Sequence, residues 1–211
     1  MGNASGVKRE FCAENFTEIP AAIAAGVDRI ELCDNLAVGG TTPSYGVIEA
    51  VARAIGDRGI VNSVMIRPRG GDFVYDDDEL AIMAADIPKA IEAGADSLVF
   101  GILTADGELD VAAMRRLIAL AGNTPVVCHM AFDYTRDPAA TLEALVGLGV
   151  KLVLTHGAPG GEPINLERLA ALVKQGEGRI DIMIGGGVNA GNYQEYAAAT
   201  GAKYAHGTKI I

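Results

Sequence analysis

Eight short apolar segments alternate with Ala- and Leu-rich stretches along this chain, and few folds accommodate such an alternation. The apolar segments read as strands over 9–13, 28–33, 61–67, 97–102, 125–130, 151–155, 180–184 and 202–206. The stretches between them have helical spacing, and several end at a glycine, as at Gly26, Gly94, Gly122 and Gly149. A glycine just past a helix followed by a short turn is typical of tightly wound α/β units.

Eight strands with seven intervening helices predict a small TIM-type (β/α)8 barrel, because a doubly wound sheet commonly has five or six strands. The eighth predicted strand ends five residues before the last residue of the sequence, so we expect the last outer helix to be lacking. A partner subunit would cover that gap, which predicts a homodimer or a higher homo-oligomer. Residues 1–7 are interpreted as a flexible tail, and residues 8–211 as a single barrel domain.

The charge of the chain limits which partners it can bind, and its cysteines indicate the compartment in which it works. The net charge is −10 and the pI is about 4.7, which disfavours binding to nucleic acid or to a phospholipid surface. No apolar run approaches the ~18 residues that span a bilayer, and the first residues lack the apolar core of a secretion signal. Three widely spaced cysteines are then expected to be reduced thiols. The chain is predicted to be cytoplasmic.

Polar side chains gather where the predicted strands end, which is the face that carries the active site in such barrels. The candidate residues are Glu14, Glu31, Cys33, Arg67, Arg69, Asp72, His129, Asp133, His156, Gly185, Gly186, Gly187, Thr208 and Lys209. All three histidines of the chain, His129, His156 and His206, fall at such ends. A single histidine there could simply cap a strand, but the set favours a functional rim.

Period-two alternation along the strands predicts which side chains face the barrel axis. Glu14, Glu31, Arg67 and His129 are expected to face inward and to share one cup, with Arg67 paired to Glu14 or Glu31. Burying such charges costs several kcal/mol each unless they are paired. Either a structural ion-pair network or a polar ligand pocket fits this pattern.

Two glycine-rich segments are candidates for binding an anion. In "SVMIRPRGGDFVY" a strand ends on Arg67, Arg69 and Asp72, and two guanidinium groups suit a carboxylate or a phosphate. The segment Gly185–Gly187 precedes a helix, and Thr208 and Lys209 follow the last strand, where phosphate sites of these barrels often lie. The glycines could also form nothing more than a tight turn.

Cys12 and Cys33 are predicted on adjacent strands, both facing inward. Two thiolates are ligands that Cu(I) prefers, whereas two small buried hydrophobic side chains are the simpler interpretation. Cys128 is predicted to face outward, toward the helices.

Five segments together resemble the CutC family of copper homeostasis proteins. They read "RIELCDNLAVGGTTPSYG", "MIRPRGGDFVY", "LVFGILTADGELD", "HMAFD" and "IMIGGGVN", and the likeness extends from about residue 10 to the end of the chain. The resemblance implies a cytoplasmic, oligomeric TIM-type barrel that binds or handles copper, with Cys12 and Cys33 as the proposed Cu(I) ligands. The chain departs from the usual family pattern at Met130, His156 and Ile184.

Two functions therefore compete. The first is a cytosolic copper-binding protein of copper homeostasis. The second is an enzyme acting on a small anionic substrate, such as a phosphorylated compound. In that enzyme Arg67 and the Gly185–Gly187 loop bind the anion, and His129 acts as acid or base with Glu14 or Glu31. The remaining catalytic candidate is Asp133, and the ligand-binding candidates are Arg69, Asp72, His156, Thr208 and Lys209. An inert scaffold is a third interpretation, and the charged interior disfavours it.

Overall fold

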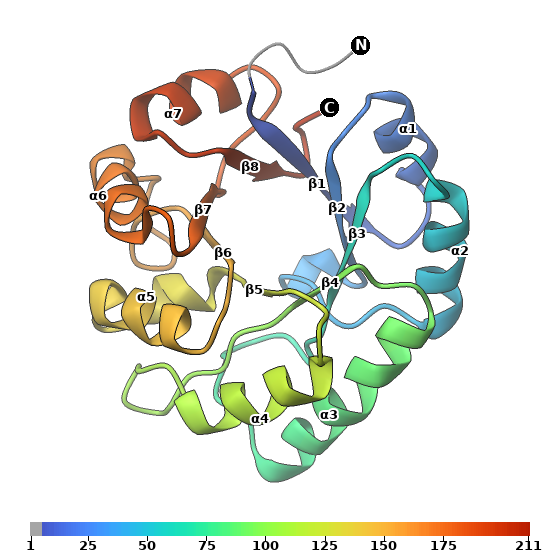
Figure 1. Ribbon diagram of the computed structural model, residues 1–211, viewed down its shortest axis with the longest axis horizontal. Helices are drawn as coiled ribbons and strands as arrows, with labels where there is room; N and C mark the ends of the chain where they lie inside the picture. Colours follow the sequence, from blue (N-terminus) through green and yellow to red (C-terminus); the bar gives the residue numbers. More distant parts are fainter. Residues whose placement is uncertain (1–5) are drawn as a thin grey trace.

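The structure is a computed structural model that describes residues 6–211, and in it eight parallel strands close into a barrel (Figure 1). The strands are paired in sequence order, and β8 pairs with β1 to close the ring. Their bounds are β1 Lys8–Glu14, β2 Arg29–Cys33, β3 Val61–Met65, β4 Ser97–Val99, β5 Val126–Cys128, β6 Leu152–Thr155, β7 Asp181–Ile184 and β8 Tyr204–Gly207. The predicted TIM-type barrel is confirmed.

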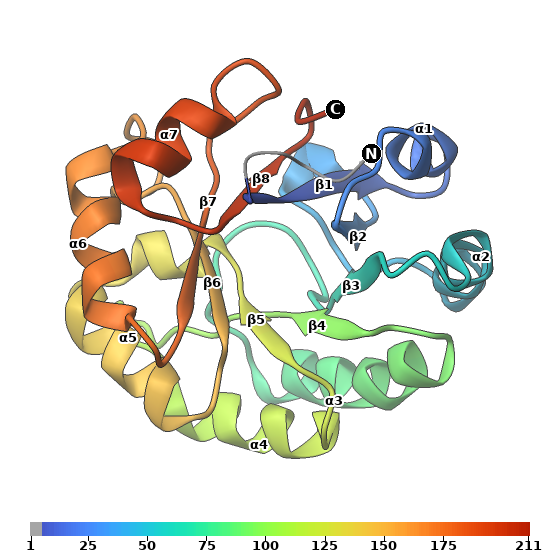
Figure 2. The same cartoon turned by 45° about the horizontal axis from the view of Figure 1, so that its top comes forward.

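Seven α-helices of the described residues surround the barrel (Figure 2). They are α1 Ile19–Ala24, α2 Tyr45–Ile55, α3 Asp77–Glu92, α4 Val111–Ala121, α5 Pro138–Gly147, α6 Leu166–Gly176 and α7 Tyr193–Thr200, with short 3₁₀ turns η1 Leu36–Val38 and η2 Met130–Tyr134. As expected, no helix follows β8 within residues 208–211. The predicted tail, residues 1–7, falls mostly outside the described residues. None of the described helices is long and apolar enough to cross a membrane.

The residues after β8 fill part of the place that an eighth helix would take. Ile210 is fully buried and belongs to the apolar core between barrel and helices. A Cβ atom built on Gly207 would lie 3.8 Å from the Cβ of Ile210 and 2.3 Å from the carbonyl oxygen of Val188. The chain therefore packs tightly against the outer face of β8, and this part of the gap is closed without a partner subunit.

Local sequence explains where several helices begin. The Asp76 side chain accepts a hydrogen bond from the Glu79 amide, and the Glu79 side chain accepts one from the Asp76 amide, which forms a capping box for α3. Asp110 and Asp137 cap α4 and α5 in the same way, through single hydrogen bonds. Aspartate side chains thus fix the start of three of the helices.

Three strands end earlier than the apolar runs predict. β3, β4 and β5 stop at Met65, Val99 and Cys128, whereas the runs continue to 67, 102 and 130. The Arg67 amide bonds the Thr42 hydroxyl at 2.9 Å, and His129 is the N-cap of η2. The backbone thus leaves the sheet at the residues whose side chains enter the barrel mouth.

The interior of the barrel has an apolar side and a polar side. On the β3–β7 side the interior is filled by Met65, Val99, Val127, Leu152, Leu154 and Met183, which pack with the two inward cysteines. On the other side, the closure of β1 against β2 and β8 brings polar residues together. Glu10 is in register with Arg29 and His206, and Cys12 with Glu31. Chain ends far apart in sequence therefore share one site.

Candidate functional site

The first candidate site is a group of two thiols and a carboxylate, Cys12, Glu31 and Cys33, which we call the thiol–carboxylate cluster. Their ligand atoms all lie within 4.8 Å of one another. One oxygen of Glu31, Oε2, lies 3.4 Å from Cys12 Sγ and 3.7 Å from Cys33 Sγ. Cys33 is fully buried, and Cys12 is 6% exposed. The inward orientation predicted for these three residues is confirmed.

Two further residues extend this cluster down the barrel axis. His206 Nδ1 lies 2.9 Å from Glu10 Oε1, and its Nε2 lies 3.7 Å from Glu31 Oε2. The other Glu10 oxygen accepts a 2.8 Å hydrogen bond from Arg29 Nε. A continuous row of paired side chains thus runs from Arg29 through Glu10 and His206 to Glu31.

Burial and the neighbouring charges set the protonation of this row. Burial disfavours the charged carboxylate of Glu10, but the Arg29 guanidinium and His206 hold its pKa below the ordinary value. Burial also opposes the charge on His206, but Glu31 and the other anionic neighbours raise its pKa well above the ordinary value. His206 is therefore an imidazolium at neutral pH, paired with an ionised Glu10.

The two thiols differ in their acidity. A hydrogen bond from the Cys33 thiol holds the pKa of Cys12 well below its ordinary value, and His206 acts in the same direction. That same hydrogen bond, together with burial, raises the pKa of Cys33. Burial likewise raises the pKa of Glu31. Cys12 is thus the thiol that supplies the first thiolate.

The donor set of the cluster fits a soft metal ion. Thiolates favour Cu(I), and the chain has its three cysteines free. Glu31 Oε1 is buried and has no hydrogen-bond partner among the described residues. An unpartnered buried oxygen is costly, and a bound cation would offset that cost. Glu31 and His206, with Glu10, form a second group whose ligand atoms lie within the same 4.8 Å range.

An open hollow of about 420 Å³ lies beside His206 at the barrel mouth. Its lining consists of Met130, Gly186, Gly187, Val188, Asn189, His206, Gly207, Thr208 and Lys209. Met130 also packs against the apolar interior group that contains both cysteines. Of the residues predicted to bind an anion, Gly186, Gly187, Thr208 and Lys209 meet here. Gly186 has a φ of 73°, and a Cβ on it would lie 2.7 Å from the Cβ of His156.

Arg67 lies apart from the carboxylates with which it was expected to pair. Its guanidinium donates to the carbonyl oxygens of Val38, Gly40 and Gly71 at 3.0, 2.9 and 2.8 Å. Among the described residues no carboxylate lies within 4.0 Å of it, although only 3% of Arg67 is exposed. The expected pairing with Glu14 or Glu31 is therefore not found, because the loop after β2 supplies carbonyl acceptors instead.

His129 is buried near Arg67, at the end of β5. Its Nδ1 accepts a 3.2 Å hydrogen bond from the Ala131 amide, and its Nε2 is buried without a partner among the described residues. Burial and the Arg67 charge lower the pKa of His129 to about 3. The ring of Phe73 lies 4.9 Å from the His129 ring and 4.8 Å from Arg67 Cζ. His129 is thus a neutral side chain at pH 7.

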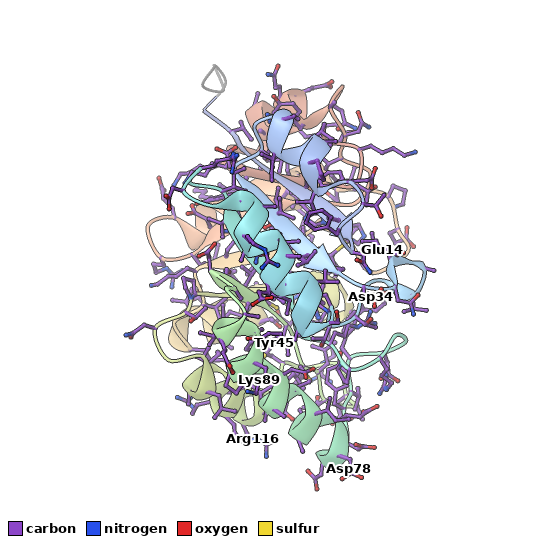
Figure 3. All side chains as sticks on the ribbon, turned by 90° about the vertical axis from the view of Figure 1, so that its right-hand side faces the viewer. Glu14, Asp34, Tyr45, Asp78, Lys89 and Arg116 are labelled. Carbon is purple, nitrogen blue, oxygen red and sulfur yellow. The ribbon has the colours of Figure 1, made fainter. Side chains whose placement is uncertain are left out.

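Glu14 does not join the cup that the alternation predicted. It is exposed at the end of β1, where Figure 3 shows it at the surface, and its Oε2 accepts a 2.6 Å hydrogen bond from the Leu36 amide. The strand ends at Glu14, so the side chain leaves the barrel interior and holds η1 instead. The four residues expected in one cup are thus divided among the surface, the thiol–carboxylate cluster and the Arg67–His129 region.

Arg69 and Asp72 hold the loop after β3 onto α3. Arg69 Nη2 lies 3.1 Å from Asp72 Oδ1 and donates to the Val74 carbonyl at 2.8 Å. The same guanidinium also pairs with Glu79 of the capping box. The guanidinium of Arg69 is thus engaged by the loop and by α3.

Asp133 and His156 form a buried pair beside β6. His156 Nδ1 lies 2.6 Å from Asp133 Oδ2, and its Nε2 lies 3.2 Å from the Pro159 carbonyl. The Thr155 hydroxyl donates to the other Asp133 oxygen. Burial raises the pKa of Asp133, although these hydrogen bonds act in the opposite direction. This network fixes the loop after β6 to η2.

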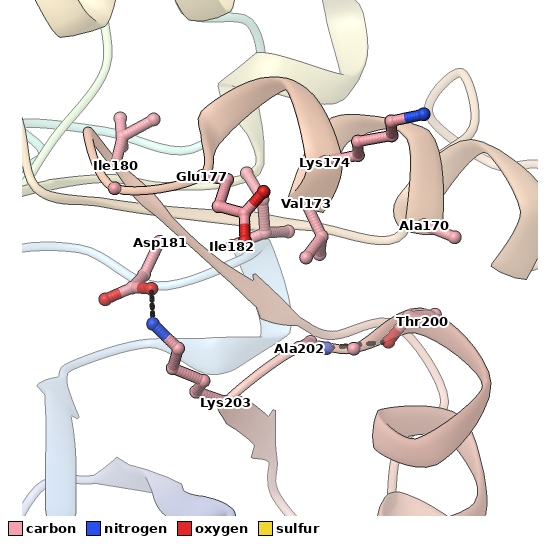
Figure 4. A pocket seen from close by; sticks show the side chains of 12 residues that line it. Ala170, Val173, Lys174, Glu177, Ile180, Asp181, Ile182, Thr200, Ala202 and Lys203 are labelled. Atoms are coloured by element: carbon pink, nitrogen blue, oxygen red, sulfur yellow. Dashed lines mark hydrogen bonds and ion pairs between the residues drawn. The ribbon is translucent and has the colours of Figure 1, made fainter.

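Another hollow, of about 340 Å³, lies between α6 and α7 near the amino ends of β7 and β8 (Figure 4). Its charged pair is Lys203 with Asp181, whose atoms are 3.1 Å apart. None of its lining residues is a cysteine or a histidine. It contains none of the candidate site residues.

Sequence reasoning left three residues of the site unassigned: Glu10, His206 and Met130. Glu10 lies two residues before Cys12, so alternation also turns it inward, and His206 falls at the end of the last predicted strand. When the barrel closes, the inward residues of the first and last strands become neighbours. Barrel closure would therefore have predicted that Glu10 and His206 lie side by side. Met130 could not be assigned in this way, because a methionine within an apolar run is typical of the hydrophobic core.

Comparisons with known proteins show which family this chain resembles. The family model described as "CutC family" matches residues 7–211. A CutC family protein of Streptococcus pyogenes serotype M6 is 52% identical over 207 residues, covering 96% of this chain and 99% of that protein. The human "Copper homeostasis protein cutC homolog" is 43% identical over 205 residues, covering 97% of this chain and 74% of that protein.

Solved structures agree with the fold. A CutC structure from Streptococcus agalactiae is 49% identical, has a TM-score of 0.94, and covers 97% of this chain and 100% of that chain. A deoxyribose phosphate aldolase from Aeropyrum pernix is 18% identical with a TM-score of 0.69, covering 98% of this chain and 87% of that chain. The second likeness concerns the barrel fold alone.

Proposed function

Because this chain belongs to the CutC family, we propose that it is a cytosolic protein of copper homeostasis that binds Cu(I) at the thiol–carboxylate cluster. The observation that supports the proposal is the meeting of Cys12, Glu31 and Cys33, whose ligand atoms lie within 4.8 Å of one another, while Glu31 Oε1 is buried without a partner among the described residues. A reducing compartment keeps these thiols available.

The charges around the cluster suit a monovalent soft cation. Two thiolates with one Cu(I) carry a net charge of −1, and the His206 imidazolium beside them compensates for that charge. Metal binding requires deprotonated ligands. Cys12 has the lower pKa and would bind first, whereas Cys33 would lose its proton as the ion arrives.

The ion would reach the buried thiols through the hollow that Met130 and His206 line. Met130 borders both this hollow and the apolar group that contains the cysteines. Its thioether is itself a soft donor for Cu(I). We therefore assign to Met130 the first contact with the entering ion.

A competition titration tests the proposal. The reduced protein is titrated with Cu(I) against a chromophoric Cu(I) chelator, alongside the double variant Cys12→Ser, Cys33→Ser. The matched control is Cys128→Ser, because Cys128 is equally buried but packs on the outer face of the sheet. We expect one Cu(I) per chain in the wild type and in the control, and loss of that binding in the double variant. Wild-type affinity in the double variant would refute the proposal.

Homo-oligomerisation is a second part of the proposal, carried over from the family resemblance. Sedimentation velocity at micromolar concentration measures it directly. We expect a dimer or a larger assembly, and a single monomeric species would contradict it.

A further inference from the structure

β7 and β8 stop pairing at the barrel mouth and pair again further along. The last residues at which the two strands pair are Ile184 and Ala205. Beyond them, Asn189 and Lys209 form an isolated parallel bridge. The segments between these two pairs are residues 185–188 and 206–208. The open hollow of about 420 Å³ beside His206 is lined by residues of both segments, so it lies where the two strands have separated.

Four backbone amides of these segments donate no hydrogen bond within residues 6–211. They belong to Gly186, Gly187, Val188 and Thr208. All four residues line the hollow. The wall of one open hollow thus contains four N–H donors without an acceptor from the described part of the chain.

The direction of the Val188 N–H follows from the carbonyl before it. In a trans peptide the N–H points away from the carbonyl of the preceding residue, and none of the described peptides is cis. The Gly187 carbonyl accepts a 3.1 Å hydrogen bond from Asn192 Nδ2, at the start of α7. The Val188 N–H therefore points away from Asn192, which does not line the hollow.

The Thr208 N–H approaches the hollow from the side of β8. The Lys203 carbonyl accepts from the Lys8 amide of β1. Because carbonyls alternate along a strand, the Gly207 carbonyl also faces β1. The next N–H, that of Thr208, therefore points away from β1 and toward the segment that follows β7.

The lining of the hollow is cationic, although the chain as a whole has a net charge of −10. None of its lining residues is an aspartate or a glutamate. His206 lines the hollow but is paired with Glu10 and Glu31. Lys209 forms no ion pair within the described residues, so its ammonium is the uncompensated charge. The hollow thus favours an anionic ligand.

The donors fit a phosphate group better than a carboxylate. The amides are joined by the Thr208 hydroxyl and the Lys209 ammonium, and both side chains are exposed. A phosphate monoester offers three acceptor oxygens, and a carboxylate offers two. Consecutive N–H groups in a turn form a concave site for such anions, and Gly186 and Gly187 have φ values of 73° and 82°, which favour glycine. Met130 adds an apolar side chain to the lining.

We propose that this hollow binds the phosphate group of a small organic phosphate monoester. The phosphate oxygens accept from the amides of Gly186, Gly187, Val188 and Thr208. Lys209 balances the charge, and the organic part lies against Met130. The donors are distinct from those of the thiol–carboxylate cluster, and the site does not depend on copper binding. No reaction is assigned to it.

Amide proton–nitrogen NMR of the metal-free, reduced protein tests the site, because its result does not depend on copper. The probes are inorganic phosphate, butyl phosphate and pentanoate. We expect saturable shifts of the four amide signals. Butyl phosphate should bind about tenfold more tightly than inorganic phosphate, which lacks the contact with Met130, and than pentanoate, which lacks the third oxygen.

Three results of this titration would overturn the proposal or part of it. Absence of saturable shifts of the four amides with both phosphate probes would overturn the site. Equal affinity for pentanoate would overturn the assignment to phosphate. Equal affinity for inorganic phosphate would overturn the assignment to an organic monoester.

Variants of exposed residues test the donors without disturbing the core. Lys209→Gln removes the uncompensated charge, so we expect the Kd of butyl phosphate to rise about tenfold. The matched control is Lys174→Gln, which alters a lysine of the hollow between α6 and α7 and should leave the Kd unchanged. Thr208→Glu places a carboxylate in the hollow and should abolish binding, whereas Thr208→Gln, of similar size, should weaken it less. Wild-type affinity in Lys209→Gln and Thr208→Glu would refute the site.

Discussion

Two buried histidines at the same end of the barrel have opposite charge states. His206 lies between the carboxylates of Glu10 and Glu31, which raise its pKa well above the ordinary value. His129 is buried beside Arg67, and its pKa falls to about 3. One region thus gathers anions around a cationic ring, and the other places a neutral ring beside a cation.

The difference shows that one end of a barrel can hold a cationic ring among carboxylates and a neutral ring beside a guanidinium. Thiol and carboxylate donors on β1 and β2 suit a metal cation, whereas Arg67 and His129, after β3 and β5, offer no such donor set. The apolar side of the interior, with Met183 and Leu154, shows that the barrel can also be filled without charge. Buried ion pairs are often no more stabilising than apolar packing, so the polar side is better explained by binding than by stability.

The largest expected effect comes from breaking the polar row. Glu10→Leu leaves both Arg29 and His206 without their buried carboxylate, so the free energy of unfolding should fall by about 3–5 kcal/mol. Urea unfolding measures it. The control is Met183→Leu on the apolar side, which should cost less than about 1.5 kcal/mol. Equal losses in the two variants would contradict the comparison.

The two histidines should give opposite pH dependences of stability. The folded pKa of His129 is below that of the unfolded chain, so its contribution is present above about 6.5 and is lost as the pH falls toward 3. The folded pKa of His206 is raised, so its contribution is full below about 6.5 and is lost as the pH rises through the folded pKa. Each effect amounts to a few kcal/mol at most, since a fully shifted group contributes about 1.4 kcal/mol per pH unit.

Urea unfolding measures this pH dependence. The wild type, His129→Asn and His206→Asn are compared between pH 4 and pH 9. The loss caused by His206→Asn should shrink toward high pH, because the pair it removes is already weakened there. The loss caused by His129→Asn should shrink toward low pH. Parallel curves for both variants would show that the two rings have the same charge state.

A smaller effect concerns the entry of copper. Met130→Leu keeps the apolar volume but removes the thioether, and we expect the affinity for Cu(I) to fall about tenfold. Met183→Leu is the matched control, because Met183 is fully buried in the same interior group and does not line the hollow. A competition titration compares them, and equal affinities would assign Met130 to packing alone.

The smallest effect is a difference in reactivity among the three cysteine thiols. Limiting iodoacetamide at neutral pH should modify Cys12 before Cys33 and Cys128, because the thiolate is the reactive form. Burial raises the pKa of Cys128 to about 12, and the hydrogen bond with Cys12 raises that of Cys33. Peptide mass spectrometry identifies the modified residue. Preferential labelling of Cys33 would contradict the assigned order of acidity.

The sequence was sufficient for the fold and for the inward face of β2. Alternation along β1 and β2 correctly turned Cys12, Glu31 and Cys33 inward, and the register of the two strands brings Glu31 beside Cys12 rather than Arg67. It failed at Glu14, because alternation holds only while the residue stays in the ladder, and the strand ends there.

Pairing between distant loops was beyond sequence reasoning. The acceptors of Arg67 are backbone carbonyls of Val38, Gly40 and Gly71, and no side-chain pattern reports where carbonyls point. The engagement of Arg69 with Glu79 likewise depends on how a loop folds back onto α3. Charge type alone suggested ion pairs with the wrong partners.

X-ray absorption at the copper edge of the Cu(I)-loaded, reduced protein tests the central claim most directly, because it counts the sulfur atoms around the ion. We predict one copper per chain with two sulfur neighbours, or three if Met130 also binds, and a spectrum without sulfur scattering in the double variant Cys12→Ser, Cys33→Ser. A first shell of nitrogen and oxygen alone, or the same sulfur shell in the double variant, would contradict binding at this cluster.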